Sequence, residues 1–235
     1  MRVLVTGGAG RIGTHLFKNL KGKYEFRGLD IVASPLYKDF VVANVTDWNA
    51  VFEATKGVDA IIHLSNVGPE WEQAKQSMIG TYNVYESAAR NGVKHIAFAS
   101  RGGIFPRTFY PRHMMRTATM LPRPESYYSI TKVFGEAMGD MYSAKYGISI
   151  VSVRIGNFDP QRTQLIDPHQ MGNGDCVRVF EAAINHSGGK HERVFGVSDS
   201  NWPLYDIEHG KKAIGYYPQE KSIVPEDQIE RPPKK

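Results

Sequence analysis

The chain has 235 residues and a formal net charge of +5, and 41% of its residues are hydrophobic. This length and composition are typical of one sizeable globular α/β domain and exclude an intrinsically disordered chain. The Lys and Arg residues are scattered along the chain, so we expect a solvated basic surface and no nucleic-acid partner.

The single cysteine, the spacing of the histidines and the length of the apolar runs indicate which compartment and which ligands to expect. The one cysteine, Cys176, excludes an internal disulfide and fits a reducing compartment. No apolar run reaches the ~18 residues that a membrane span needs, so we expect a cytoplasmic protein with no membrane partner. The histidines lack the spacing of metal ligands, and no metal site is predicted.

The first strand and turn organise the rest of the chain. Residues 2–5 form a short apolar run that is typical of a buried parallel strand. Residues 6–13, Thr-Gly-Gly-Ala-Gly-Arg-Ile-Gly, then read as a glycine-rich turn that opens into a helix at residues 11–20. A turn this sharp needs residues without a Cβ, and the free N–H groups at the start of the helix favour phosphate oxygens.

An acidic residue follows at the distance expected of a dinucleotide site. Asp30 ends the second predicted strand, where its carboxylate would accept hydrogen bonds from both adenosine ribose hydroxyls and repel a 2′-phosphate. NAD is therefore favoured over NADP, although a basic residue in the turn weakens this preference. The cofactor-binding residues predicted from this unit are Gly7, Gly10, Arg11, Ile12, Gly13, Asp30 and Ile31.

Short apolar runs alternate with helical segments, as they do in βαβ units. This alternation predicts an α/β Rossmann-type fold, a doubly wound parallel sheet with a small C-terminal substrate lobe. Further strands are expected at 40–43, 59–64, 93–99, 148–155 and 193–197, and helices at 48–55, 70–91, 127–146, 176–185 and 207–214. The predicted units are an NAD-binding core at 1–157, a lobe with terminal elements at 158–220 and a tail at 221–235, which we expect to be disordered.

Residues 102–126 carry many Gly, Pro and Arg residues and show no clean period, so they are expected to form a long loop. Loops of this length are uncommon unless they are functional. The parallel strands on either side place their carboxyl ends along one edge of the sheet, where ligands of such folds bind. The residues at these strand ends, from the glycine turn to Asn157, are therefore expected to share one cleft.

Tyr128 and Lys132 lie four residues apart on a predicted helix, so both side chains leave the same face. A free tyrosine is a poor base with a pKa near ~10, and a nearby ammonium favours its phenolate. At ~4 Å and an effective dielectric constant of ~20, that attraction is about 4 kcal/mol before desolvation losses. We expect Tyr128 to remove a proton from a substrate hydroxyl, with Lys132 as its electrostatic partner.

The motifs together resemble a known family. Thr-Gly-Gly-Ala-Gly-Arg-Ile-Gly at 6–13, His-Leu-Ser at 63–65, Tyr-Ser-Ile-Thr-Lys at 128–132 and Val-Arg-Ile-Gly-Asn at 153–157 look like an extended short-chain dehydrogenase/reductase. The chain is similar to the NAD-dependent epimerase/dehydratase type of that superfamily, and most similar to uronate dehydrogenases. Those enzymes use NAD to oxidise C1 of a hexuronate to a lactone.

The resemblance implies further site residues. Asn44 and Val45 would stand where the family contacts adenine, Leu64 and Ser65 would flank the adenosine and its ribose, and Lys132 would bond the nicotinamide ribose. On the substrate side, the resemblance implies Asn157, and Arg162 as a carboxylate-binding residue. It also implies a homodimer built through the helices at 70–91 and 127–146.

The substrate side departs from the family pattern after the fifth strand. Arg101 takes the place of a Ser or Thr whose hydroxyl binds the reacting oxygen, and Ser100, predicted as a catalytic residue, stands one position earlier. On a regular strand Ser100 would point to the opposite face. Two interpretations stay open at this stage: Arg101 binds a carboxylate or phosphate of the substrate, or the chain binds NAD with little or no turnover.

The expected function is NAD-dependent oxidation of a sugar or sugar acid. A nucleotide-sugar epimerase or dehydratase is the enzymatic alternative, which the short C-terminal part disfavours because a nucleotide diphosphate needs a larger pocket.

Overall fold

Seven parallel strands form the central sheet of the computed structural model, which describes residues 1–232. The strand order is β3-β2-β1-β4-β5-β6-β9, so the chain reverses direction across the sheet between β1 and β4, where ligands of doubly wound folds bind. The predicted Rossmann-type fold is confirmed. The strands of this sheet are β1 (Arg2–Thr6), β2 (Glu25–Asp30), β3 (Asp39–Val42), β4 (Ala60–His63), β5 (His95–Arg101), β6 (Ser149–Ile155) and β9 (His191–Gly196).

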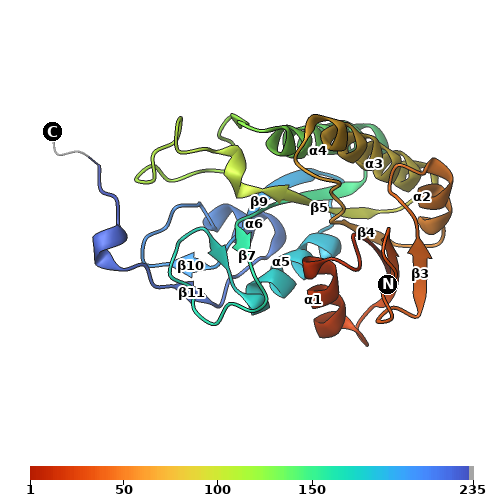
Figure 1. Ribbon diagram of the computed structural model, residues 1–235, viewed down its shortest axis with the longest axis horizontal. Coiled ribbons are helices and arrows are strands. Elements are labelled where there is room, and N and C mark those ends of the chain that lie inside the picture. Colours follow the sequence, from red (N-terminus) through yellow and green to blue (C-terminus); the bar gives the residue numbers. More distant parts are fainter. Residues whose placement is uncertain (233–235) are drawn as a thin grey trace.

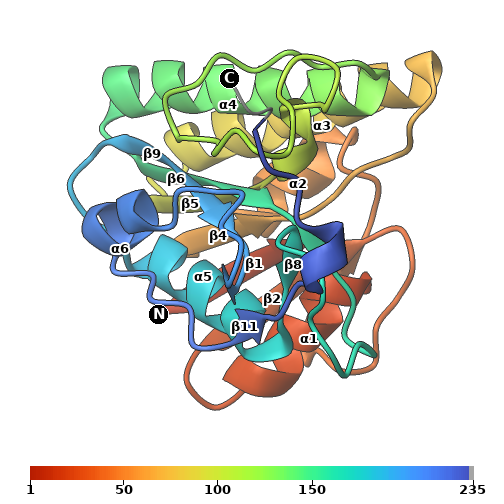
Figure 2. The same cartoon turned by 90° about the vertical axis from the view of Figure 1, so that its left-hand side faces the viewer.

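Helices cover both faces of the sheet, as Figures 1 and 2 show. One face carries α2 (Trp48–Ala54), α3 (Trp71–Arg90) and α4 (Tyr127–Tyr146), and the other carries α1 (Arg11–Leu20) and α5 (Asn173–Asn185). Each face encloses its own apolar cluster, with Leu4, Ile61 and Phe98 on the first side and Val3, Ile62 and Phe180 on the second. Successive strand residues alternate between these faces, so nearly every residue of the inner strands is apolar.

Local sequence signals set the ends of the helices that border the cleft. Asp47 caps α2 by accepting a hydrogen bond from the Ala50 N–H at 3.1 Å. Ser126 caps α4 in the same way through the Ser129 N–H, also at 3.1 Å. Gly147 ends α4 in a left-handed conformation, with φ at 67°, which a residue without a Cβ adopts readily.

The C-terminal part is more closely built into the fold than the sequence suggests. Helix α5 and strand β9 extend the sheet and its cover, and α6 (Glu208–Ile214) packs against β9. Short strand pairs join distant segments of this part: β7 (Asn157–Phe158) with β8 (Gln170–Met171), and β10 (Asp199–Ser200) with β11 (Lys221–Ser222).

The expectation of a disordered tail is wrong for its first residues. Ser222 and Val224 are buried, because β11 adds a strand to β10 and Val224 accepts and donates hydrogen bonds with Asn201. A short turn of 3₁₀-helix, η2 (Glu226–Gln228), follows. Residues 233–235 of the predicted tail lie outside the described residues.

The predicted loop at 102–126 is confirmed, and it is ordered by packing. It begins with a single turn of 3₁₀-helix, η1 (Gly102–Ile104), and then runs over the lobe between β5 and α4 (Figure 1). Ile104, Phe105 and Tyr110 form a third apolar cluster with Phe195 and Tyr205. This cluster fastens the loop to the C-terminal part of the chain rather than to its sequence neighbours.

Candidate active site

The glycine turn after β1 is shaped for a close approach between backbone segments. Gly7 has φ at +72°, and a Cβ on it would lie 3.0 Å from the Ser65 nitrogen. A Cβ on Gly13 would lie 2.6 Å from the Gly7 carbonyl oxygen, so only glycine lets α1 start this close to the turn. Gly10 caps α1 without a side-chain bond, which leaves the first N–H groups of the helix to a ligand.

Asp30 closes the turn from the end of β2. Its Oδ2 accepts a hydrogen bond from the Ala9 N–H at 3.1 Å, and its Oδ1 accepts one from the Val32 N–H at 3.4 Å. The carboxylate is half-buried and lines the same cavity as the glycines. A free helix start with a carboxylate beside it suits a dinucleotide, whose phosphates take the N–H groups and whose ribose hydroxyls donate to the acid.

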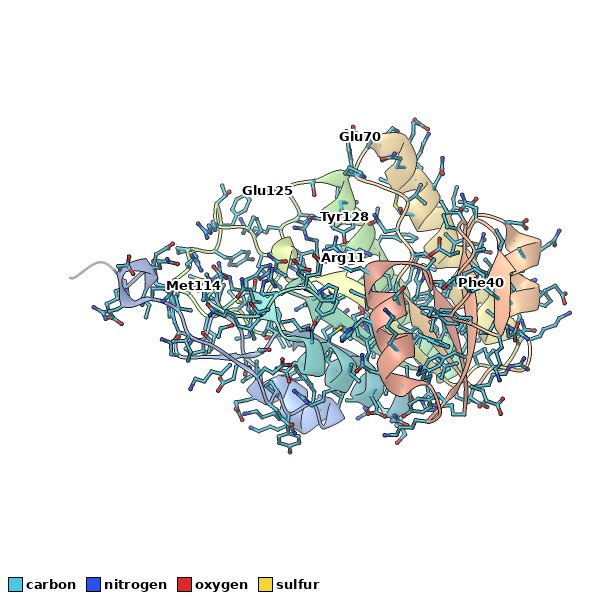
Figure 3. The ribbon with its side chains drawn as sticks, turned by 60° about the horizontal axis from the view of Figure 1, so that its bottom comes forward. Arg11, Phe40, Glu70, Met114, Glu125 and Tyr128 are labelled. Carbon is cyan, nitrogen blue, oxygen red and sulfur yellow. The ribbon has the colours of Figure 1, made fainter. Side chains whose placement is uncertain are left out.

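A cavity of about 550 Å³ runs along the carboxyl edge of the sheet. Every site residue predicted from the sequence lines it, with the exception of Arg162. Arg11 and Tyr128, on the first turns of α1 and α4, lie near one another in Figure 3, while Met114 lies out in the lobe. The structure thus brings together residues that are more than 100 positions apart, whereas their individual roles stay predictions.

Arg162 lies elsewhere. Its guanidinium Nη1 donates a hydrogen bond to the Asn157 carbonyl oxygen at 2.8 Å, and the side chain lies outside the lining of the cavity. This contact ties the loop after β7 to that strand. The carboxylate-binding role implied for Arg162 gains no support from this position.

Tyr128 and Lys132 meet at the middle of the cavity. The Lys132 Nζ lies 5.3 Å from the centroid of the Tyr128 ring and 5.3 Å from that of Phe98. Lys132 is only 4% exposed, and burial lowers its pKa to about 8, with the positive charge of Arg101 acting in the same direction. The lysine is therefore a buried cation at neutral pH that can lose its proton a little above it.

The lowering of the Tyr128 pKa that we expect from Lys132 stays a prediction. Burial raises the pKa of Tyr128 above its ordinary value, and the group that opposes this rise is Arg101. The Lys132 ammonium sits beside the face of the ring, 5.3 Å from its centroid, and no hydrogen bond joins it to the phenol in the part of the chain that the structure describes. The spacing of four residues places both side chains on one face of α4, but tertiary packing adds the second cation.

Arg101 ends β5 with its guanidinium over the Tyr128 ring. The guanidinium carbon lies 4.9 Å from the ring centroid, and Nη1 donates to the Ser129 Oγ at 3.4 Å. A Cβ at Gly103 would lie 2.4 Å from Nη2 of Arg101, so the guanidinium occupies the space that a side chain at position 103 would take. Glycine at 103 is what permits this pose.

Ser100 is part of the cavity wall, but its side chain points away from that of Arg101, as strand alternation predicts. Its hydroxyl donates to the Glu136 Oε1 at 2.6 Å, inside a buried cluster in which Glu136 also pairs with Arg154 at 2.8 Å. Ser100 is 2% exposed, and Glu136 engages its hydroxyl within the cluster. The predicted catalytic role of Ser100 gains no support from this contact, which makes it part of the scaffold behind the cleft.

His169 is a cavity residue that the sequence did not reveal. Its Nδ1 bonds the Tyr205 hydroxyl at 2.5 Å, and burial lowers the pKa of His169 to about 4, so the imidazole is neutral at physiological pH. His169 lies on an irregular segment, and its hydrogen-bond partner Tyr205 is 36 residues further along the chain. No periodic pattern or motif surrounds it, so no local signal marks it.

Across residues 1–232, no cluster of three or more His, Cys, Asp or Glu side chains is placed to hold a metal ion. No helix within that range is both long and apolar enough to cross a membrane.

The geometry of the cleft agrees with comparisons with known proteins. The model of the NAD dependent epimerase/dehydratase family matches residues 3–204. The chain belongs to this family. The dinucleotide cradle described above fits the NAD of the family's name, with the glycine turn toward the phosphates and Asp30 toward a ribose.

Individual relatives cover nearly the whole chain. The NAD-dependent glucose-6-phosphate dehydrogenase of Haloferax volcanii is 34% identical over 250 residues, covering 94% of each chain. The uronate dehydrogenase of Pseudomonas putida is 34% identical over 231 residues, covering 94% of this chain and 85% of its own. The crystal structure of uronate dehydrogenase from Agrobacterium tumefaciens superposes with a TM-score of 0.85 at 30% identity, over 94% of this chain and 85% of its own.

Proposed function

We propose that this chain is an NAD-dependent dehydrogenase that oxidises a hydroxyl of a sugar or sugar acid. The observation that carries this proposal is the meeting of Tyr128, Lys132 and Arg101 in the cavity that also holds the glycine turn and Asp30. Relatives named for the oxidation of uronates and of glucose 6-phosphate support the substrate class.

Tyr128 takes the role of general base. NAD, when bound, supplies the acceptor for the two electrons and the hydrogen that leave the substrate carbon. The phenol is half-buried and protonated by itself at neutral pH, because burial raises its pKa. Two cations near the ring, Arg101 and Lys132, favour the phenolate that must form when the phenol passes its proton on.

Lys132 has two tasks in this proposal. At neutral pH its ammonium is charged, since its lowered pKa of about 8 still exceeds the ambient pH, and it donates to a ribose hydroxyl of the cofactor. Because the pKa of Lys132 is low, its ammonium also gives up its proton readily. Once the ammonium has lost a proton to solvent, the neutral amine could accept the proton of Tyr128, and a pKa near the operating pH suits such a relay.

Arg101 takes the place of the missing hydroxyl donor. A guanidinium offers several N–H groups and a full charge, so it can bind the reacting oxygen or an adjacent anionic group of the substrate. Only the weak 3.4 Å bond to Ser129 and the ring contact hold it in the described chain, so its remaining N–H groups face the cleft lining. Asn157 lines the same end and is proposed as a second substrate contact.

The chain is proposed to divide its work between two regions. Residues 1–157 hold the cofactor and the Tyr–Lys pair, and residues 158–220 supply the substrate wall, although α5 and β9 of the second region also complete the sheet. The site residues are proposed as predicted, except that Ser100 and Arg162 are assigned to the scaffold because of their bonds to Glu136 and Asn157.

We further propose a cytoplasmic homodimer. Seven large apolar side chains on α3 and α4 are more than 40% exposed, which is consistent with a second copy packing against these helices. The reduced, buried Cys176 agrees with a reducing compartment. The seven side chains are Trp71, Ile79, Tyr82, Tyr127, Ile130, Met141 and Tyr146.

The test is a substrate panel. Hexuronates, aldoses and aldose phosphates are offered with NAD, and NADH is followed by its absorbance. Turnover of at least one member, abolished in Tyr128→Phe, is the expected result. Silence across the panel, with NAD still bound in calorimetry, would overturn the proposal in favour of an NAD-binding protein without turnover.

A further inference from the structure

A second cavity, of about 400 Å³, adjoins the reactive cleft. The two cavities share Gly103, Asn157 and His169 in their linings, so one begins where the other ends. The second is walled by the long loop after β5 and by segments near 167–170 and 204–205. Its lining contains neither Arg101 nor Tyr128 and no residue of the glycine turn.

Three arginines line this second cavity: Arg107, Arg112 and Arg116. Asp167 is the one carboxylate in the lining, and it pairs with Arg112 at 2.7 Å. Within residues 1–232, neither Arg107 nor Arg116 forms an ion pair with a carboxylate. The lining therefore carries an excess of positive charge, and like charges held together in this way are costly unless an anion joins them.

Arg116 is built into the wall rather than loosely attached. It is 2% exposed, and its guanidinium donates to the backbone carbonyls of Tyr110, Pro111 and Met114. Its Nε is buried and has no hydrogen-bond partner in the described chain. The guanidinium is fixed in the cavity wall and has no carboxylate partner there, so its positive charge is not balanced within the lining.

Arg112 and Arg107 also line the second cavity, Arg112 as a half-buried residue and Arg107 as an exposed one. Arg112 is held by Asp167 and by the Trp202 ring, 4.6 Å from its guanidinium carbon, while Arg107 is exposed at the rim. Guanidinium groups match phosphate oxygens with paired N–H donors, and several of them around one site suit a dianion better than a single carboxylate. The cavity is also larger than a carboxylate would need.

We propose that this arginine pocket (Arg107, Arg112 and Arg116) binds the phosphate of a phosphorylated sugar whose reacting hydroxyl lies at Tyr128. The inference rests on the proposed dehydrogenase function and names its substrate class. The shared residues Gly103, Asn157 and His169 then lie along the carbon chain of the sugar, between the phosphate and the reacting carbon.

The first experiment compares substrates and variants. Glucose 6-phosphate, glucose and glucuronate are oxidised with NAD, and kcat/KM is measured in a buffer without phosphate. We expect glucose 6-phosphate to exceed glucose by about 100-fold, the range that one or two charge-assisted hydrogen bonds supply. In Arg107→Gln this ratio falls about tenfold. In Arg123→Gln, an exposed arginine of the same loop outside both linings, the ratio is unchanged.

The second experiment needs no turnover. Calorimetry of the full chain with inorganic phosphate should detect binding that Arg107→Gln weakens, and phosphate should compete with the sugar phosphate in steady-state kinetics. Phosphate inhibition that is not competitive with the sugar would overturn the proposal, since the anion would then occupy a separate site.

Different results would overturn the arginine pocket and the dehydrogenase function. Preference for glucuronate over glucose 6-phosphate, with a ratio unaffected by Arg107→Gln, overturns the arginine pocket and leaves the dehydrogenase function standing. Silence with every sugar overturns the dehydrogenase function. In that case, equal phosphate affinities of the wild type and Arg107→Gln overturn the pocket as well.

Discussion

The two ends of the cleft are built by different kinds of contact. The cofactor end is local: Gly7, Gly13 and Asp30 are brought together by one strand-turn-helix unit and the strand that follows it. The substrate end is assembled from distant segments, as the bonds of Tyr205 to His169 and of Arg112 to Asp167, 36 and 55 residues apart, illustrate.

This difference explains how one fold serves several sugars. Because the cofactor end depends on backbone geometry, few residues can change there without loss of the cradle. The substrate end depends on side chains at a strand end, such as Arg101, and on the arginines of the loop at 102–126, which can change without altering the sheet. Variants at one end of the cleft should therefore change cofactor binding and variants at the other end should change turnover.

Tyr128→Phe should have the largest effect on turnover and almost none on the binding of NAD. Removing the phenol takes away the proposed base, so turnover should fall by about 10³-fold or more, within the range known for general acid–base groups. The affinity for NAD, measured by calorimetry, should stay within about twofold because the glycine turn and Asp30 are unchanged. Tyr127→Phe is the matched control, since Tyr127 is 48% exposed and packs on Trp71. Equal activity of both variants would contradict the role of Tyr128.

Lys132→Met should stabilise the fold in a pH-dependent way. Burial lowers the pKa of Lys132 from 10.5 to about 8, so the folded chain bears a cost of about 3 kcal/mol at any pH at which the lysine is protonated in both states. Below pH 8 that cost is fully present, and it disappears as the pH rises toward 10.5, where the unfolded lysine is also neutral.

Urea unfolding measures this effect. The free energy of unfolding of Lys132→Met should exceed that of the wild type most at pH 6 to 7, and the gap should close between pH 8 and pH 10.5. Lys145→Met, at an exposed lysine of the same helix, should show no such closing gap. A gap that is constant with pH would mean that Lys132 is not a buried cation.

Asp30→Ala should damage only the cofactor end. The carboxylate offers charged acceptors to the ribose, and the loss of such bonds should weaken NAD binding by about 10- to 100-fold. Affinity for NADP should hold or rise, because the negative charge that repels a 2′-phosphate is gone. Calorimetry with both dinucleotides checks this prediction. A parallel loss for NAD and NADP would indicate that Asp30 acts by holding the Ala9 N–H and not by selecting the ribose.

Gly103→Ala should have the smallest effect, and only on the substrate end. The new Cβ would meet the mobile end of Arg101 at 2.4 Å, so the guanidinium must leave its place over Tyr128 while the backbone stays. We expect kcat/KM for the sugar to fall on the order of tenfold, below the ~10²-fold that a 1 Å displacement at a reacting centre can cost. NAD affinity and unfolding should be unchanged.

Gly210→Ala is the control for this variant, because its Cβ would meet other atoms at 3.5 Å or more. Full activity of Gly103→Ala would show that the pose of Arg101 over Tyr128 is not needed for the reaction.

The sequence predicted the sheet and the cofactor end because these depend on short-range signals. The run of apolar residues before Gly7 and the acid at the end of β2 each act within a few residues of themselves. The spacing of Tyr128 and Lys132 likewise follows from one helix. These features can be predicted without knowing which residues pack around them.

Tertiary structure decided the rest. Strand alternation predicted that Ser100 points away from Arg101, but the partner of its hydroxyl, Glu136, lies 36 residues away and came only with the tertiary structure. The pKa of Tyr128 depended on burial and on Arg101. His169 and Arg116 reached their cavities through loops with no periodic pattern. Long-range packing carries no signature in any short stretch of sequence, so only the folded chain could place them.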